Sequence, residues 1–132
     1  MQVRRLSEAP VEEFHRLKTH VLMDAGEMGS RNLSVTRVEV PPGTEQRLHS
    51  DEEAEQVYVV VSGSGQMAVA GDSQDLTEGD LILVPPATDH QLANSGDGAF
   101  ALLSIQSPAV SVAELYGGQM AEVAGYDDDE EY

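Results

Sequence analysis

Residues 43–63 read GTEQRLHSDEEAEQVYVVVSG, and residues 79–94 read GDLILVPPATDHQLAN. Each segment begins at a glycine, contains a run of valine or leucine of strand length, and carries one histidine, His49 or His90. Residues two apart on a strand share a face, so His49 and Asp51 are expected to point together. Gln56 begins the next strand and His90 comes from a third. Two imidazoles and one or two oxygens that converge in this way would suit a divalent metal ion.

Strand-like segments continue on both sides of these two stretches. Residues 33–40 alternate apolar and polar side chains and end at Pro41-Pro42-Gly43. Further strand-sized stretches cover residues 66–70, 91–94 and 100–106, with glycine, proline and asparagine turns between them. Short strands at this spacing are typical of a β-sandwich or a closed barrel. No linker or repeat divides the chain, so a single domain is expected.

The N-terminal segment allows two predictions. Residues 8–20 predict one short helix, with Ser7 as N-cap and Pro10 in the first turn. In the alternative, residues 17–23 run straight into a strand. His15 and His20 are five residues apart and would lie on different faces of either element, so both are expected to be surface or packing residues.

The two opening segments resemble the paired motifs of the cupin family, G-x5-H-x-H-x(3,4)-E-x6-G and G-x5-P-x-G-x2-H-x3-N. The positions in register are Gly43, His49, Gly63, Gly79, Pro85, His90 and Asn94. The resemblance covers residues 43–94 directly and extends over the strands from 31 to 106. It implies an all-β double-stranded β-helix, a jelly-roll barrel, in one domain spanning residues 1–126 with its core at about 31–106.

Three positions depart from the family pattern. Asp51 stands where the second histidine belongs, Gln56 where the glutamate does, and Ala87 where a turn glycine is usual. Ala87 costs little if its φ stays below zero. The resemblance then implies one divalent ion, Fe, Mn, Zn, Ni or Cu, held by His49, Asp51, Gln56 and His90.

The function implied is that of a metal-dependent enzyme acting on a small molecule that chelates through oxygen, either a dioxygenase or an isomerase or lyase. Asp51 would be the fourth ligand or a general base, and Tyr58 and Arg47 would orient the substrate. Enzymes of similar fold that use 2-oxoglutarate anchor it on a cation beyond the second histidine. The sequence has no lysine or arginine after Arg47, so this subclass of enzyme is not expected. Two alternatives stay open: a non-enzymatic binding module with a degenerate metal site, and a structural relic without metal.

The charge and composition of the chain exclude several classes of binding partner. The chain has 24 acidic and 7 basic residues in 132, a formal net charge of −17, and all the bases precede residue 48. Nucleic acid binding needs a basic face and is excluded. The absence of cysteine excludes thiolate chemistry. No apolar run is long enough to cross a membrane, and the N-terminus does not resemble a signal peptide, so a cytoplasmic protein is expected. A homodimer that buries valine-rich strands is expected too, and residues 127–132 should form a solvated, disordered acidic tail.

Overall fold

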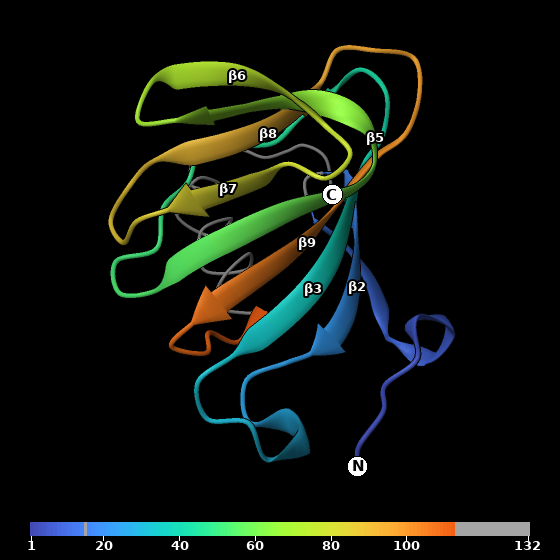
Figure 1. The fold of residues 1–132 in the computed structure, drawn as a ribbon, viewed down its shortest axis with the longest axis vertical. Helices are drawn as coiled ribbons and strands as arrows, with labels where there is room; N and C mark the ends of the chain where they lie inside the picture. The colour runs from blue at the N-terminus through green and yellow to red at the C-terminus, as the bar shows by residue number, and fades with distance from the viewer. Residues whose placement is uncertain (15, 113–132) are drawn as a thin grey trace.

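The computed structural model describes residues 1–14 and 16–112. His15 and the predicted tail at 127–132 lie outside the described residues. The regular elements are strands and two three-residue 3-10 turns (Figure 1). They follow one another as η1 (Leu6–Glu8), β1 (Val11–Phe14), β2 (Leu17–Met23), η2 (Glu27–Gly29), β3 (Ser34–Val40), β4 (Thr44–Glu45), β5 (Glu55–Val69), β6 (Asp72–Thr77), β7 (Leu81–Val84), β8 (His90–Asn94) and β9 (Phe100–Ser107). Among these described residues, no helix is long and apolar enough to span a membrane.

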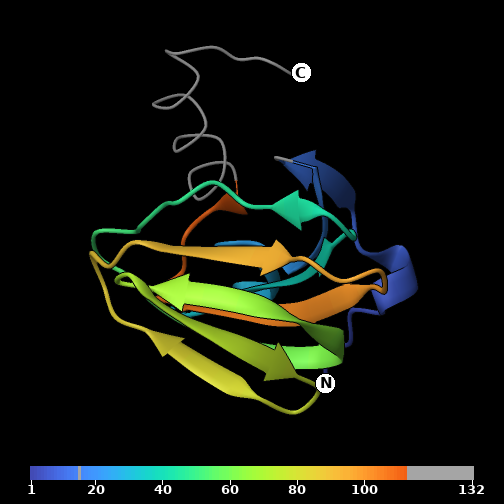
Figure 2. The same cartoon turned by 90° about the horizontal axis from the view of Figure 1, so that it is seen from above.

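The long strand β5 joins the two layers of the fold. Its first half pairs with β9 and β7, and its second half pairs with β8 and β6. A β-bulge between Val60 and Ser62 and a left-handed Gly63, with φ of 75°, lie where the strand passes from one layer to the other. The sheet therefore folds over on itself around a shared interior (Figure 2), as in a double-stranded β-helix.

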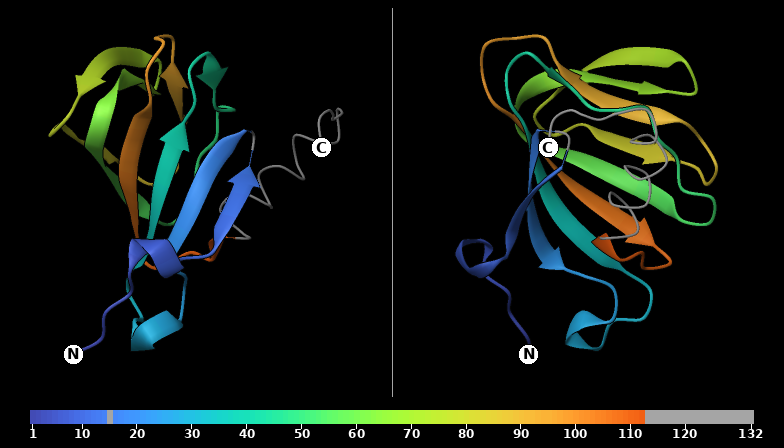
Figure 3. Two further views of the ribbon diagram at one scale, coloured as in Figure 1. Left: turned by 90° about the vertical axis from the view of Figure 1, so that its right-hand side faces the viewer. Right: turned by 180° about the vertical axis from the view of Figure 1, so that it is seen from behind.

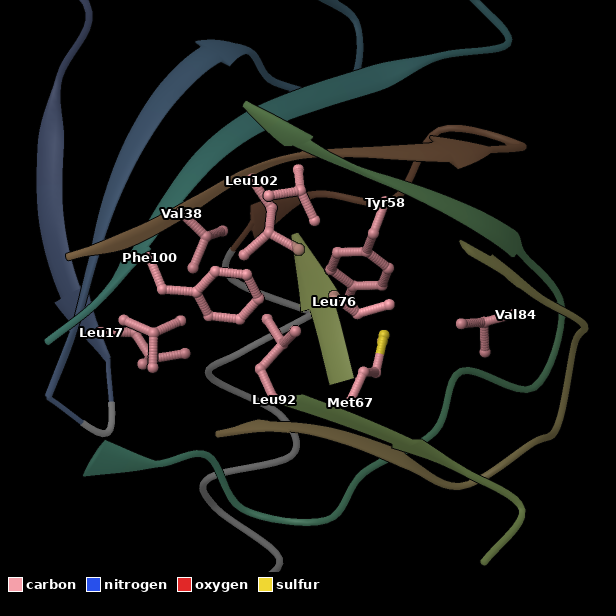
Figure 4. Close-up of a cluster of buried hydrophobic side chains, with 11 residues drawn as sticks. Leu17, Val38, Tyr58, Met67, Leu76, Val84, Leu92, Phe100 and Leu102 are labelled. Carbon is pink, nitrogen blue, oxygen red and sulfur yellow. The ribbon is translucent and has the colours of Figure 1, made fainter. Parts of the chain in front are cut away.

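The core fills this interior. Eleven buried side chains form one cluster (Figure 4): Leu17, Val38, Val40, Tyr58, Val60, Met67, Leu76, Val84, Leu92, Phe100 and Leu102. They come from both layers, because alternate residues of each strand point inward. The strict alternation of burial along β3 shows this periodicity.

The predicted helix at residues 8–20 is wrong, and the strand alternative for residues 17–23 is correct. Beyond the 3-10 turn at 6–8, the segment forms the antiparallel hairpin of β1 and β2, which lies beside β3 at the edge of the sheet (Figure 3). Leu17, Thr19 and Val21 are buried while Lys18 is exposed, which is the two-residue period of a strand. Pairing with β3 outweighs the local N-cap signal.

Two other expectations fail. Ala87 has φ of 57°, so it adopts the left-handed conformation that a glycine would occupy more cheaply. The strand predicted to begin at Gln56 and the strand predicted at 66–70 are one continuous strand, β5, and the sequence did not predict β6. Five of the six residues of β6 are exposed, so this strand carries no apolar pattern.

Candidate functional site

The two motif histidines are brought together by the backbone. His49 lies in the loop between β4 and β5, and His90 begins β8. An isolated bridge pairs them: the amide of His49 donates to the carbonyl of His90 at 3.1 Å, and the amide of His90 donates to the carbonyl of His49 at 2.8 Å. Directly paired residues share a face, and the two ring centroids lie 4.3 Å apart.

Backbone contacts also fix the protonation of both rings. Nδ1 of His49 lies 2.8 Å from the carbonyl oxygen of Arg47, and Nδ1 of His90 lies 2.9 Å from that of Thr88. A carbonyl oxygen can only accept, so each Nδ1 carries the proton and, in the neutral ring, each Nε2 carries the lone pair. Burial lowers the pKa of His90, although Thr88, Asp89 and Asp51 act in the opposite direction. His90 is therefore neutral at pH 7 and can donate its lone pair to a metal.

Gln56 and Tyr58 lie on the inner face of β5, as their shared parity predicts. Each is 1% exposed. The Tyr58 hydroxyl donates to Oε1 of Gln56 at 3.2 Å and lies 3.4 Å from Nε2 of His90. Nε2 of Gln56 is buried and has no hydrogen-bond partner among the residues that the structure describes. A buried amide without a partner is costly unless a ligand or water satisfies it, so this atom marks a place for a bound group.

Asp51 is engaged elsewhere. Its Oδ1 accepts hydrogen bonds from the amides of Glu53 at 3.0 Å and Ala54 at 2.7 Å, so the carboxylate caps the turn before β5. Its own carbonyl accepts from the amide of Ala87 at 2.6 Å, which ties the two motif loops together. Within residues 1–14 and 16–112, no three His, Asp or Glu side chains gather closely enough to hold an ion. That Asp51 is a ligand or a general base stays a prediction.

Substitutions of Asp51 distinguish its role in capping the turn from its predicted role as a metal ligand. Asp51→Ala is expected to lower the free energy of unfolding by about 1 kcal/mol, because two backbone amides lose their acceptor. Asp51→Asn keeps an accepting oxygen and should retain most of that stability. Urea denaturation measures both. A metal titration of the Asn variant then tests the ligand prediction, since a tenfold loss of affinity would support it and an unchanged affinity would contradict it.

Arg47 stands at the edge of the site. It is half-buried, and its carbonyl orients His49. Its predicted contact with substrate stays a prediction. Asn94 has a clear structural role, since its side-chain amide donates to the carbonyls of Val40 and Gly98, both at 2.8 Å.

A cleft that the sequence analysis missed lies beside these residues. It has a volume of about 470 Å³ and lies between the edge strands β6 and β7, with Met67, Val69, Leu76 and Ile82 among its lining residues. Val69 is the cross-strand partner of His90, and Ile82 is the partner of Tyr58. The cleft therefore lies on the same strands as the partners of His90 and Tyr58, while its lining does not include His49, Gln56, Tyr58 or His90. It could not be predicted without β6, whose polar sequence gave no strand signal.

Comparison with known proteins agrees with this architecture. The family model described as "Cupin domain" matches residues 36–106, more than half of the chain. An uncharacterized protein of Methanocaldococcus jannaschii is 26% identical over 108 residues, which cover 75% of this chain and 86% of that protein. The alginate biosynthesis protein AlgA of Pseudomonas aeruginosa is 31% identical over 84 residues, which cover 64% of this chain but only 17% of AlgA.

A solved structure shows the same fold. The crystal structure of a predicted oxalate decarboxylase from Thermotoga maritima superposes with a TM-score of 0.74 at 21% sequence identity, covering 81% of this chain and 99% of that one. At that identity the likeness concerns the fold alone. The family match, the folded-over sheet and the paired motif histidines agree, and the chain belongs to the cupin family.

Proposed function

We propose that this protein binds one divalent metal ion through His49, His90 and Gln56 and acts on a small molecule that chelates the ion through oxygen. The observation that carries the proposal is the histidine pair itself. Both rings are buried, both Nδ1 atoms are held by carbonyl oxygens, and the pair lies beside a buried glutamine amide. Two imidazole nitrogens and an amide oxygen are donors that fit Fe, Mn, Zn, Ni or Cu.

The charge of the donor set supports an anionic ligand. His49, His90 and Gln56 are all neutral donors, and no Asp, Glu, Lys or Arg is buried among the described residues. A divalent ion bound there would keep its full charge in a poorly solvated place, which favours a ligand that brings negative oxygen atoms of its own. An enolate, a catecholate or a 2-hydroxy acid has this chemistry.

The residues around the histidines can take defined parts in such a reaction. The bound ion would supply Lewis acidity or the activation of oxygen. The Tyr58 hydroxyl, in reach of both Gln56 and His90, can hold a proton or hand one to the substrate. Nε2 of Gln56 can donate a hydrogen bond to a substrate oxygen. Val69 and Ile82 give the adjoining cleft an apolar wall. Dioxygenase and isomerase or lyase chemistry both fit these parts.

A non-enzymatic binding module is the second candidate. The observation that favours it concerns Asp51, the predicted fourth ligand. Its Oδ1 accepts hydrogen bonds from the backbone amides of its own turn. Such a protein would bind an oxygen chelator without converting it. Incubating the metal-loaded protein with a catechol and with a 2-hydroxy acid distinguishes the two: product formation supports an enzyme, whereas binding without turnover supports the module.

The metal itself is tested on wild-type protein. Purified without added metal, or reconstituted after treatment with a chelator, the protein should contain about one divalent ion per chain by elemental analysis. Reconstitution with each of Fe(II), Mn(II), Zn(II), Ni(II) and Cu(II) at pH 7 gives the preference. A site that stays empty with all five ions contradicts the proposal.

A further inference from the structure

The cleft between β6 and β7 does not include the residues proposed to bind metal. Its volume of about 470 Å³ lies within the range of cavities that hold small organic molecules. In the part of the chain that the structure describes, β6 and β7 each pair with β5 alone, so the cleft lies between two edge strands. A molecule held there would touch a different set of side chains from a substrate bound at the histidines.

Apolar side chains form a wall of the cleft that runs from the core to the protein surface. Met67 and Leu76 are 3% and 9% exposed and belong to the core cluster of Figure 4. Ile82 is partly buried and packs against that cluster. Leu81 and Leu83 line the cleft as well, and they are 63% and 52% exposed. Exposed leucines beside a cavity offer contact area to the apolar part of a ligand.

The charged side chains of the cleft are all acidic. Asp72, Asp75 and Asp80 line it, and no lysine, arginine or histidine does so among the described residues. Oδ2 of Asp80 accepts a hydrogen bond from the amide of Thr77 at 2.8 Å. Within residues 1–14 and 16–112, none of the three aspartates forms an ion pair. Every lysine and arginine of the sequence precedes residue 48, so the cleft combines an apolar wall with negative charges that no described basic residue neutralises.

This combination selects a cation with an apolar body. An anion would be repelled by the three carboxylates and by a chain whose formal net charge is −17. A neutral apolar molecule would contact the wall but gain nothing from the carboxylates. An ammonium group donates hydrogen bonds that carboxylate oxygens accept, and its apolar body covers the exposed leucines. The proposed metal site favours ligands of the opposite charge, so the two sites select different molecules.

We propose that the cleft between β6 and β7 binds a small amphipathic organic cation, a protonated amine on an apolar body, independently of the metal site. The apolar body packs on the wall formed by Ile82 and the two exposed leucines, and the ammonium group lies among the three aspartates. Such a ligand fills the space between two edge strands, which otherwise present apolar surface to water.

Three indole compounds with the same ring and two-carbon linker test the preference for positive charge. Tryptamine carries an ammonium group, tryptophol a hydroxyl group and indole-3-propionate a carboxylate. The chain has no tryptophan, so indole fluorescence reports on the probe alone. At low salt tryptamine should bind saturably and about tenfold more tightly than tryptophol, and indole-3-propionate should bind most weakly. Ethylamine, which has the charge without the ring, should compete poorly, and added salt should weaken only the binding of tryptamine.

Substitution of two aspartates tests where the ammonium group binds. The double variant Asp72→Asn, Asp75→Asn should lower the affinity for tryptamine about tenfold and leave that for tryptophol unchanged, because only the cation gains from the carboxylates. Both residues are exposed, so the fold should persist by circular dichroism. The matched control, Glu12→Gln, Glu13→Gln, removes the same charge from exposed residues of β1, which β2, β3 and β9 separate from β5. It should bind tryptamine as the wild type does.

Nuclear magnetic resonance locates the apolar body. Tryptamine should cause its largest backbone amide shifts on β6 and β7, not at His49 or Gln56. Its affinity should be the same with and without a chelator, so an empty metal site would leave this result unchanged. The proposal would be overturned by a lack of saturable binding, equal affinities for tryptamine and tryptophol, or shifts centred on the histidines. A double variant that binds like the wild type, a control that loses affinity equally, or a requirement for metal would overturn it too.

Discussion

His49→Ala and His90→Ala are expected to reduce metal affinity by about 100-fold or more, so that each variant is purified with little or no bound ion. Each substitution removes one of two imidazoles whose Nδ1 atoms are already held in place by carbonyl oxygens. With only the remaining histidine and Gln56 as protein ligands, water would fill most of the coordination positions of a bound ion. Elemental analysis and calorimetric titration at pH 7 measure the loss.

His20→Ala is the control for these variants. His20 is also part of the sheet and half-buried, but its Nε2 lies 3.2 Å from Oε2 of Glu39 on the outer surface. Its loss should leave the metal content unchanged. If His49→Ala and His90→Ala both retained stoichiometric metal, or if His20→Ala lost it equally, the histidine pair would not be the site.

The histidine pair could be predicted because its signals are local. A glycine, a histidine and a strand rich in valine or leucine define each motif within about twenty residues. Gln56 and Tyr58 share the inner face because both residues lie on β5, where alternate side chains point the same way. Each motif brings one histidine, and the pairing of the two segments brings the rings together.

The same parity rule does not apply to Asp51. His49 forms only an isolated bridge, and the residues after it are loop, so Asp51 need not point with His49. Its carboxylate instead accepts hydrogen bonds from the backbone amides two and three residues later in the sequence, as aspartate commonly does in turns. The left-handed Ala87 and the exposed strand β6 escaped prediction for different reasons. Ala87 is held by a distant residue, since its amide donates to the carbonyl of Asp51. β6 pairs with the adjacent part of β5, but its mostly exposed polar residues show no apolar pattern.

Gly63→Ala is expected to lower the free energy of unfolding by about 3 kcal/mol or more, or to abolish soluble expression. Gly63 closes the first motif, has φ of 75°, and pairs with Phe100 where β5 passes between the layers. A Cβ there would overlap the backbone carbonyl oxygen of Ala99 and lie 2.9 Å from its carbonyl carbon. Backbone atoms cannot relieve the overlap by a rotamer change as a flexible side chain can. β5 and β9 would therefore have to separate locally.

Gly71→Ala isolates the part of this cost that comes from the close approach. Gly71 also has a left-handed φ, 84°, but a Cβ there meets no heavy atom within 4 Å. Its substitution should cost only about 1 kcal/mol, the strain of a left-handed alanine. Urea denaturation followed by circular dichroism gives both values. Equal losses in the two variants would mean that the strands at Gly63 can part freely, and that this glycine is required only for its backbone angle.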